Sequence, residues 1–243
     1  SRLLRRTYKK GKAAFVFQAS SIFFRMCFQL KFDFSAPKES RLYNFFRPLA
    51  KGFVSLAFCV KSFGEENIPK EGAFILAANH IGALDPVMII SRCPRTLHFM
   101  AKDELFKNRL FAFFLRKMNV FPVRRQTSDK RALEFAKHII SSGWVLGIFP
   151  EGARIKDAIP KKAKNGVSYL AAKTKADVLP VSIYKTPQEK KLRPKITIRF
   201  GKLIKNSELS LDGEYSQQKI REASEKIMDA IKELWSLKHG ELQ

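Results

Sequence analysis

The chain has 243 residues, of which 45% are hydrophobic and 28% are charged, and these proportions exclude an intrinsically disordered protein. Its 46 lysines and arginines against 22 aspartates and glutamates give a formal net charge of +24, which predicts an anionic partner such as a membrane surface. No zinc-finger, recognition-helix or RNA-binding aromatic motif accompanies this charge, so nucleic acid is not the expected partner.

The three cysteines, Cys27, Cys59 and Cys93, are isolated from one another and form no C-x-x-C pair. An odd number of scattered cysteines predicts neither a disulfide framework nor a zinc site, and it fits a reducing compartment. The first apolar run breaks early and no small-residue cleavage site follows it, so we do not expect a secretory signal peptide.

Residues 1–63 differ in composition from the rest of the chain. Basic residues precede two aromatic and aliphatic segments, at 13–30 and 42–60, and Arg25 and Arg47 interrupt these segments. Because a spanning helix needs about 20 mainly apolar residues, we interpret them as an antiparallel pair of amphipathic helices in a membrane interface. The alternative is a helical pair that packs against the folded domain and buries its aromatic residues there.

Residues 64–243 alternate between short apolar runs and amphipathic stretches. This alternation predicts an α/β layered domain, with a mixed sheet flanked by helices and a site at the strand ends. The expected strands are residues 73–78, 97–101, 119–123, 145–149, 178–184 and 195–200, and the expected helices are 128–142, 165–174 and 216–237.

The most informative local feature is His80, which follows the first of these strands and lies five positions before Asp85. A neutral imidazole oriented by a carboxylate is a competent general base near neutral pH. The alternative is structural, because Asp85 followed by Pro86 is also an ordinary helix start and His80 could be a loop residue. No second ligand is suitably spaced, so no metal site is expected.

A second polar group follows the strand at 145–149. Pro150 and Gly152 predict a sharp turn that would aim Glu151 and Arg154 at the strand end, where a guanidinium could bind phosphate in a bidentate fork. Lys102, just after the strand at 97–101, is a candidate for the same pocket, although it could equally be a solvated lysine. The run Lys161, Lys162 and Lys164 is interpreted as a basic outer face, and His98, His138 and His239 as structural.

Four blocks together make the chain resemble the glycerolipid acyltransferases, most closely the bacterial lysophosphatidic acid acyltransferases, over about residues 60–205. The chain departs from that pattern at Ala153, where Thr or Ser is usual, and at Pro122-Val123, where Ile-Asp is frequent. The blocks are His80 with Asp85, Phe121-Pro122-Val123-Arg124, Phe149-Pro150-Glu151-Gly152-Ala153-Arg154 and Val178-Leu179-Pro180-Val181.

The resemblance implies transfer of a fatty acyl group to the sn-2 hydroxyl of lysophosphatidic acid, giving phosphatidic acid. The donor would be a thioester of acyl carrier protein or coenzyme A, with no other cofactor. His80 would be the general base and Asp85 its orienting acid. The substrate phosphate would be held by Arg124, Glu151, Gly152, Arg154 and Lys102.

The same interpretation places the protein on the cytoplasmic face of the cell inner membrane, as a peripheral or monotopic enzyme. No Ser or Cys nucleophile adjoins His80 in sequence, so direct attack by the acceptor hydroxyl is expected. Two alternatives stay open. One is an acyltransferase of the same fold that acts on another lysophospholipid or on glycerol 3-phosphate. The other is a non-catalytic basic protein that binds membranes or nucleic acid.

Overall fold

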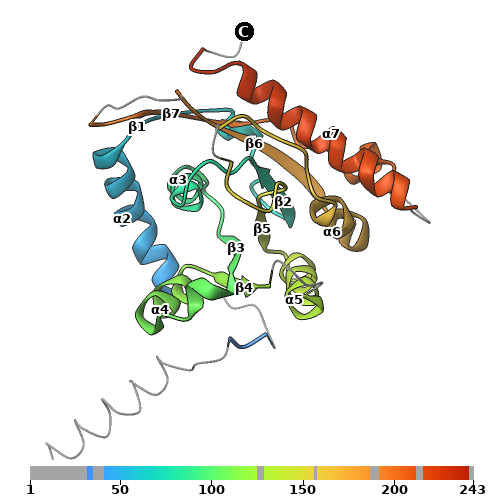
Figure 1. Ribbon diagram of the computed structural model, residues 1–243, viewed down its shortest axis with the longest axis horizontal. Coiled ribbons are helices and arrows are strands. Elements are labelled where there is room, and N and C mark those ends of the chain that lie inside the picture. Colours follow the sequence, from blue (N-terminus) through green and yellow to red (C-terminus); the bar gives the residue numbers. More distant parts are fainter. Residues whose placement is uncertain are drawn as a thin grey trace, which may run out of the picture.

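The computed structural model describes residues 32–34, 41–124, 129–155, 158–186, 192–211 and 216–240. The first expected amphipathic helix, at 13–30, lies outside these residues. Within them, a seven-stranded sheet is covered by helices on both faces (Figure 1). The fold class expected from the sequence, a layered α/β domain with a mixed sheet, is therefore confirmed.

The strand order of the sheet is β1-β7-β6-β2-β5-β3-β4. Every neighbouring pair is parallel except β6 and β7, which are antiparallel. The six expected strands are present with small shifts at their ends, and β1 is an addition. The strands are β1 (Cys59–Phe63), β2 (Phe74–Ala78), β3 (Leu97–Lys102), β4 (Val120–Val123), β5 (Val145–Ile148), β6 (Asp177–Lys185) and β7 (Lys195–Phe200).

The helices form two layers, with α5, α6 and α7 on one face of the sheet and α2 and α3 on the other, while α4 lies near the β4 edge (Figure 1). The three helices expected in residues 64–243 correspond to α5, α6 and α7. The helices are α2 (Arg41–Ala57), α3 (Asp85–Arg92), α4 (Arg109–Lys117), α5 (Lys130–Ser141), α6 (Gly166–Thr174) and α7 (Gln217–Ser236).

Strand β2 shows why the sheet has a core on each side. All five of its residues are buried. Ile75 and Ala77 join the core beneath α5, α6 and α7, whereas Phe74, Leu76 and Ala78 join the core beneath α2 and α3. Successive side chains of a strand point to opposite faces, so a central strand must be apolar at every position. The two polar residues that follow β2 directly, Asn79 and His80, are buried as well.

Helix α2 is apolar on two sides. On one side it packs against α3, where Tyr43 and Val54 are fully buried and the Tyr43 hydroxyl accepts a hydrogen bond of 3.1 Å from the Leu97 N–H. The other side carries an exposed stripe at helical spacing, which we call the α2 stripe. It consists of Leu42, Phe45, Leu49, Phe53 and Leu56.

The segment after α2 joins the sheet. Residues 59–63, which the sequence analysis placed at the end of the N-terminal appendage, form edge strand β1 and pair with β7. None of the helices in the described residues combines the length and the apolar character needed to span a bilayer.

Candidate active site

His80 and Asp85 lie where β2 ends and α3 begins. The His80 Nδ1 is 2.7 Å from the Asp85 Oδ2, and the same oxygen accepts the backbone N–H groups of Ile81 and Gly82 at 2.7 and 2.8 Å. Asp85 is fully buried. Its carboxylate therefore folds back onto the loop that carries the histidine.

The structural alternative for Asp85 is accurate only in part. Asp85 and Pro86 do open α3, but Leu84 occupies the N-cap position and makes no side-chain cap. The carboxylate instead contacts the imidazole, so the spacing of five residues brings the two side chains together.

The pairing decides which ring nitrogen can act. Because Nδ1–H is donated to Asp85, the lone pair lies on Nε2. Nothing among the described residues hydrogen-bonds to Nε2. The His80 side chain is 10% exposed, so the ring is largely shielded from water. This is the arrangement of a general base whose orienting partner is already in place.

The imidazole rests on two aromatic rings. His80 stacks on Phe149, with centroids 4.1 Å apart and planes 19° from parallel. Phe149 in turn stacks on Phe99 at 5.8 Å and 18°. Gly147 leaves room for this arrangement, since a Cβ on it would lie 2.2 Å from the Phe99 ring.

The backbone of His80 is held by the loop after β5. Its N–H donates to the Glu151 Oε2 at 2.8 Å, and its carbonyl accepts from the Ile155 N–H at 2.8 Å. The Glu151 Oε1 accepts the Lys161 N–H at 3.1 Å. Glu151 was expected to bind the substrate, but it is buried and its two oxygens brace backbone amides. These bonds connect Glu151 to the backbone at His80 and Lys161, and its contact with substrate stays a prediction.

Asn79 is a site residue that the sequence analysis missed. Its buried side-chain amide donates to the Ile183 carbonyl at 2.9 Å and accepts the Ile183 N–H at 2.7 Å. This pair of bonds fastens the end of β2 to β6. A polar amide directly after five apolar residues was the available signal, because such a residue needs a partner when buried.

A cavity of about 300 Å³ lies beside the ends of β3, β4 and β5. Arg124, Lys164 and Gly152 contribute to it, and Phe149 is shared between this cavity and the His80 stack. The apolar part of its lining consists of Met100, Val123, Ala132, Leu133, Ile148, Phe149 and Val167. Cationic groups and an apolar wall therefore meet next to the imidazole's own support.

The two cations of the cavity are placed differently. The Arg124 Nε lies 3.4 Å from the Asp103 Oδ2, and its backbone N–H donates to the Asp129 Oδ2 at 3.1 Å. Lys164 crosses Gly152, where a Cβ would lie 2.9 Å from the lysine Cδ. Lys164, which was expected on a basic outer face, is exposed, and its side chain also lines the cavity.

Two of the expected phosphate ligands do not line this cavity. Lys102 pairs with Glu104 at 2.8 Å on the surface, and that hydrogen bond lowers the Glu104 pKa to about 2. Arg154 is exposed on the loop after Gly152. Of the five residues expected at the phosphate, Arg124 and Gly152 are brought together in the cavity and Glu151 lies behind it.

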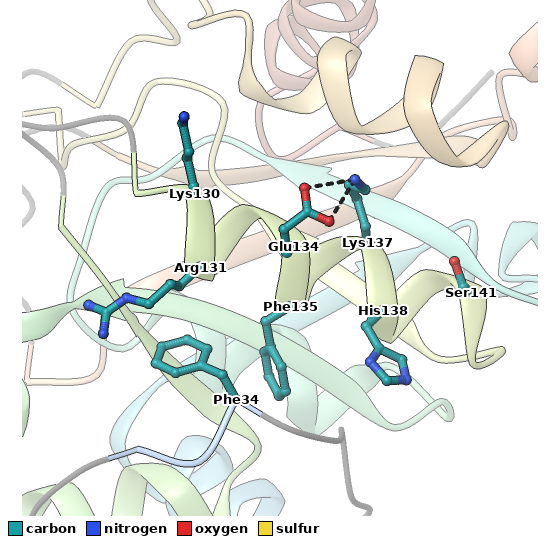
Figure 2. A pocket seen from close by; sticks show the side chains of 8 residues that line it. All are labelled: Phe34, Lys130, Arg131, Glu134, Phe135, Lys137, His138 and Ser141. Atoms are coloured by element: carbon teal, nitrogen blue, oxygen red, sulfur yellow. Dashed lines mark hydrogen bonds and ion pairs between the residues drawn. The ribbon is translucent and has the colours of Figure 1, made fainter.

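Other histidines lie away from this pair. His98 is buried on β3 near Trp144, and both ring nitrogens of His239 bond to threonines, Thr186 and Thr197, at 2.9 Å. His138 lines an open pocket on the outer side of α5, where Lys137 holds Glu134 (Figure 2). The residues drawn there contain no imidazole–carboxylate pair, and the described residues include no cluster that could hold a metal ion.

Comparison with known proteins shows the family. A family model described as Acyltransferase matches residues 59–184. A 1-acyl-sn-glycerol-3-phosphate acyltransferase of Bacillus subtilis is 30% identical over 199 residues, which cover 76% of this chain and 98% of that protein. A protein of the same name from Borreliella burgdorferi is 34% identical over 125 residues, covering 51% of this chain and 50% of that protein.

The crystal structure of the 1-acyl-sn-glycerophosphate acyltransferase of Thermotoga maritima has the same fold. It matches with a TM-score of 0.64 at 24% identity, covering 93% of this chain and 91% of that chain. The matched family segment contains β1 to β6, His80, Asp85 and the cavity. The chain belongs to the acyltransferase family.

Proposed function

We propose that this acyltransferase acylates the sn-2 hydroxyl of 1-acyl-sn-glycerol 3-phosphate and so produces phosphatidic acid. The observation that carries the proposal is the His80–Asp85 pair of 2.7 Å, which leaves Nε2 as the proton acceptor beside a cavity with two cations. The names of the Bacillus and Borreliella relatives support this choice of acceptor.

The reaction needs one proton relay. The acceptor hydroxyl gives its proton to the His80 Nε2 while its oxygen attacks the thioester carbonyl carbon. Asp85 stabilises the imidazolium that forms. When the tetrahedral intermediate collapses, the carbon–sulfur bond breaks and the departing thiolate takes the proton from Nε2. The ester product and a free thiol remain, and the imidazole is neutral again. No acyl-enzyme is required.

Arg124 and Lys164 are assigned to the acceptor phosphate. Arg124 offers a planar fork that fits two phosphate oxygens, and Lys164 adds a point charge across Gly152. Arg154, on the exposed loop after Gly152, is assigned to the same phosphate once substrate is bound. Lys102 is not assigned to the phosphate, because it forms an ion pair with Glu104.

The donor is an acyl thioester of acyl carrier protein or coenzyme A, both of which carry negative charge toward this basic chain. The N-terminal segment through α2 is assigned to the membrane interface, whereas residues 59–63 belong to the sheet as β1. The exposed α2 stripe supports this part of the proposal. The enzyme would then act as a peripheral protein on the cytoplasmic face of the inner membrane, where its lipid acceptor resides.

Replacing the imidazole tests the chemistry. His80→Ala should lower turnover with lysophosphatidic acid by roughly 10³-fold or more, because both the base and the acid for the leaving thiol are lost. His138→Ala, which removes a histidine from the outer side of α5, is the matched control and should retain full turnover. Unchanged turnover of His80→Ala, at an unchanged melting temperature, would refute the mechanism.

The acceptor assignment has its own test. Arg124→Gln and Lys164→Gln should each raise the KM for lysophosphatidic acid by about tenfold, since each removes a charge-assisted contact with phosphate. The KM for a monoacylglycerol, which lacks the phosphate, should not change in these variants. Other lysophospholipids and glycerol 3-phosphate complete the panel. A parent enzyme that prefers any of these would contradict the proposed substrate.

A further inference from the structure

The segment between β3 and β4 presents large apolar side chains to the outside. It contains the short helix η2 (Asp103–Phe106) and then α4. Leu110 is 72% exposed, Phe111 is 44% exposed and Phe114 is 40% exposed, while Ala112 on the opposite side of the helix is buried. Leu105 of η2 is also exposed. Single exposed apolar residues are common, but four within ten residues form a patch.

This patch continues the α2 stripe. The ring of Phe114 contacts that of Phe46 at 5.7 Å, edge to face, and Phe46 contacts Phe45 of the stripe at 5.4 Å. Figure 1 shows α4 beside the lower end of α2, on the same side of the molecule. We call the α2 stripe together with Leu105, Leu110, Phe111 and Phe114 the α2–α4 surface.

Basic residues border the new part of this surface. Lys107 and Arg109 are exposed at the start of α4, and Arg116 and Lys117 are half-buried at its end. The neighbouring acids, Asp103 and Glu104, are paired with Arg124 and Lys102. Apolar side chains with a basic rim match the interface of an anionic lipid leaflet, where the apolar groups enter the acyl boundary and the cations meet the head groups.

Helix η2 connects this surface to the cavity. Asp103 begins η2, and its carboxylate lies 3.4 Å from the Arg124 Nε at the cavity. The α2–α4 surface therefore starts next to the cationic groups assigned to the substrate phosphate. A lipid head group at the level of η2 would lie close to those cations.

We propose that η2 and α4 form a second membrane-contact element, which lies in the interface of an anionic leaflet beside α2. The occupant is a lipid leaflet because the surface is apolar, basic at its rim and continuous with the α2 stripe. This inference goes beyond acyl transfer, and it is measured by vesicle binding without turnover, so its failure is distinguishable from failure of the proposed reaction.

A tryptophan placed at the patch reports contact directly. The full chain with Leu110→Trp is mixed with vesicles of phosphatidylcholine and phosphatidylglycerol, with and without bromine on the acyl chains. The parent chain supplies the baseline from Trp144 and Trp235. Brominated lipid should remove roughly half of the fluorescence that the introduced indole adds, because an interfacial helix enters the acyl boundary. Lys219→Trp on α7, a helix on the opposite face of the sheet, should not be quenched.

Affinity gives the second measurement. Leu110→Gln with Phe111→Gln should weaken binding to these vesicles on the order of tenfold, because the lost apolar area no longer enters the acyl boundary. Lys107→Gln with Arg109→Gln should weaken binding to anionic vesicles only. The control pair, Lys219→Gln with Arg221→Gln on α7, removes the same charge and should bind like the parent, provided that all variants keep the parent's melting temperature.

Two results would overturn the proposal. If the indole introduced by Leu110→Trp is not quenched, the surface is covered by something other than lipid, such as residues 1–31 or a protein partner. If the Leu110 and Phe111 variant binds vesicles as tightly as the parent, α4 contributes no contact.

Discussion

The imidazole of His80 is fixed by contacts from segments far apart in sequence. Asp85 bonds its Nδ1, Phe149 supports its ring, and Glu151 and Ile155 bond its backbone. Asn79, the residue before His80, bonds to Ile183 of β6. In the proposed role of base, an imidazole held in this way would lose little freedom when substrate binds, so less of the barrier would go into orienting it.

Glu151→Gln tests this positioning. The amide keeps one oxygen but presents an NH₂ group to a backbone N–H that now meets a carboxylate oxygen. We expect kcat to fall by about 10- to 100-fold with little change in KM, together with a stability loss of about 1–3 kcal/mol. Steady-state kinetics and urea unfolding measure the two effects. Glu134→Gln, at an exposed ion pair on α5, is the control. An unchanged kcat would show that the brace is dispensable.

Sequence alone could predict that His80 and Asp85 pair, because the two residues are only five positions apart. It could not predict that Glu151 accepts the His80 N–H, since the two residues are 71 positions apart. It did not show that Lys164 also lines the cavity, because a run of lysines normally lies in solvent. The long reach of that side chain over Gly152 becomes visible only in the folded loop.

At the scale of elements, strands β3 and β5 carry the stack under the imidazole. Phe99 of β3 lies over Gly147 of β5, and the two residues are register partners in the sheet. The absence of a side chain at Gly147 therefore determines how close Phe99 lies to β5. Through the stacked ring of Phe149 it also determines the position of His80.

Gly147→Ala should disturb this stack. Its Cβ would lie 2.2 Å from the Phe99 ring, so the ring must move. Overpacking of this kind costs about 1–3 kcal/mol, and kcat should fall because the displaced rings carry the imidazole with them. Thermal unfolding and kinetics provide the measurement. Gly52→Ala on α2, where a Cβ meets nothing within 4 Å, should not lower either quantity. A Gly147→Ala enzyme with parental stability would contradict the close contact.

The elements that sequence predicted well are those buried on both faces. β2 and β5 are continuous apolar runs, and the buried part of β6 is interrupted only by Ser182, because each strand lies between two helical layers. β1 was missed because it is an edge strand that contains Lys61 and pairs with β7, more than 130 residues later. α4, a helix of nine residues, was missed although its apolar residues keep a helical period.

At the scale of the whole molecule, Arg199 joins three remote parts of the chain. It is fully buried on β7, and its guanidinium lies 4.8 Å from the Phe63 ring of β1. Its Nη1 donates to the Lys238 carbonyl at 2.8 Å, and its Nη2 donates to the Gly240 carbonyl just after α7. Burial lowers the pKa of this guanidinium, whose charge is offset by these carbonyl dipoles.

Arg199→Met should lower the free energy of unfolding by about 2–4 kcal/mol, since two charge-assisted hydrogen bonds and the contact with Phe63 are lost. Arg199→Lys should recover only part of this, because an ammonium lacks the planar fork. Lys195→Met, at the exposed start of the same strand, should have little effect. Urea unfolding gives the comparison, and equal stabilities for the Met variants at 199 and 195 would rule out this role.

Helix α2 cannot shift relative to the domain without losing contacts, because Tyr43 and Val54 on one side are buried in it. The α2 stripe, on the other side, is exposed. If the stripe lies in a leaflet, α2 fixes the distance between the folded domain and the lipid. The distance of the imidazole from the leaflet is then set by the fold. The acceptor hydroxyl must move out of the leaflet by that same distance to reach it. Acceptors whose hydroxyl extends to a different distance from the leaflet would therefore be selected by that distance, in addition to any contact with side chains.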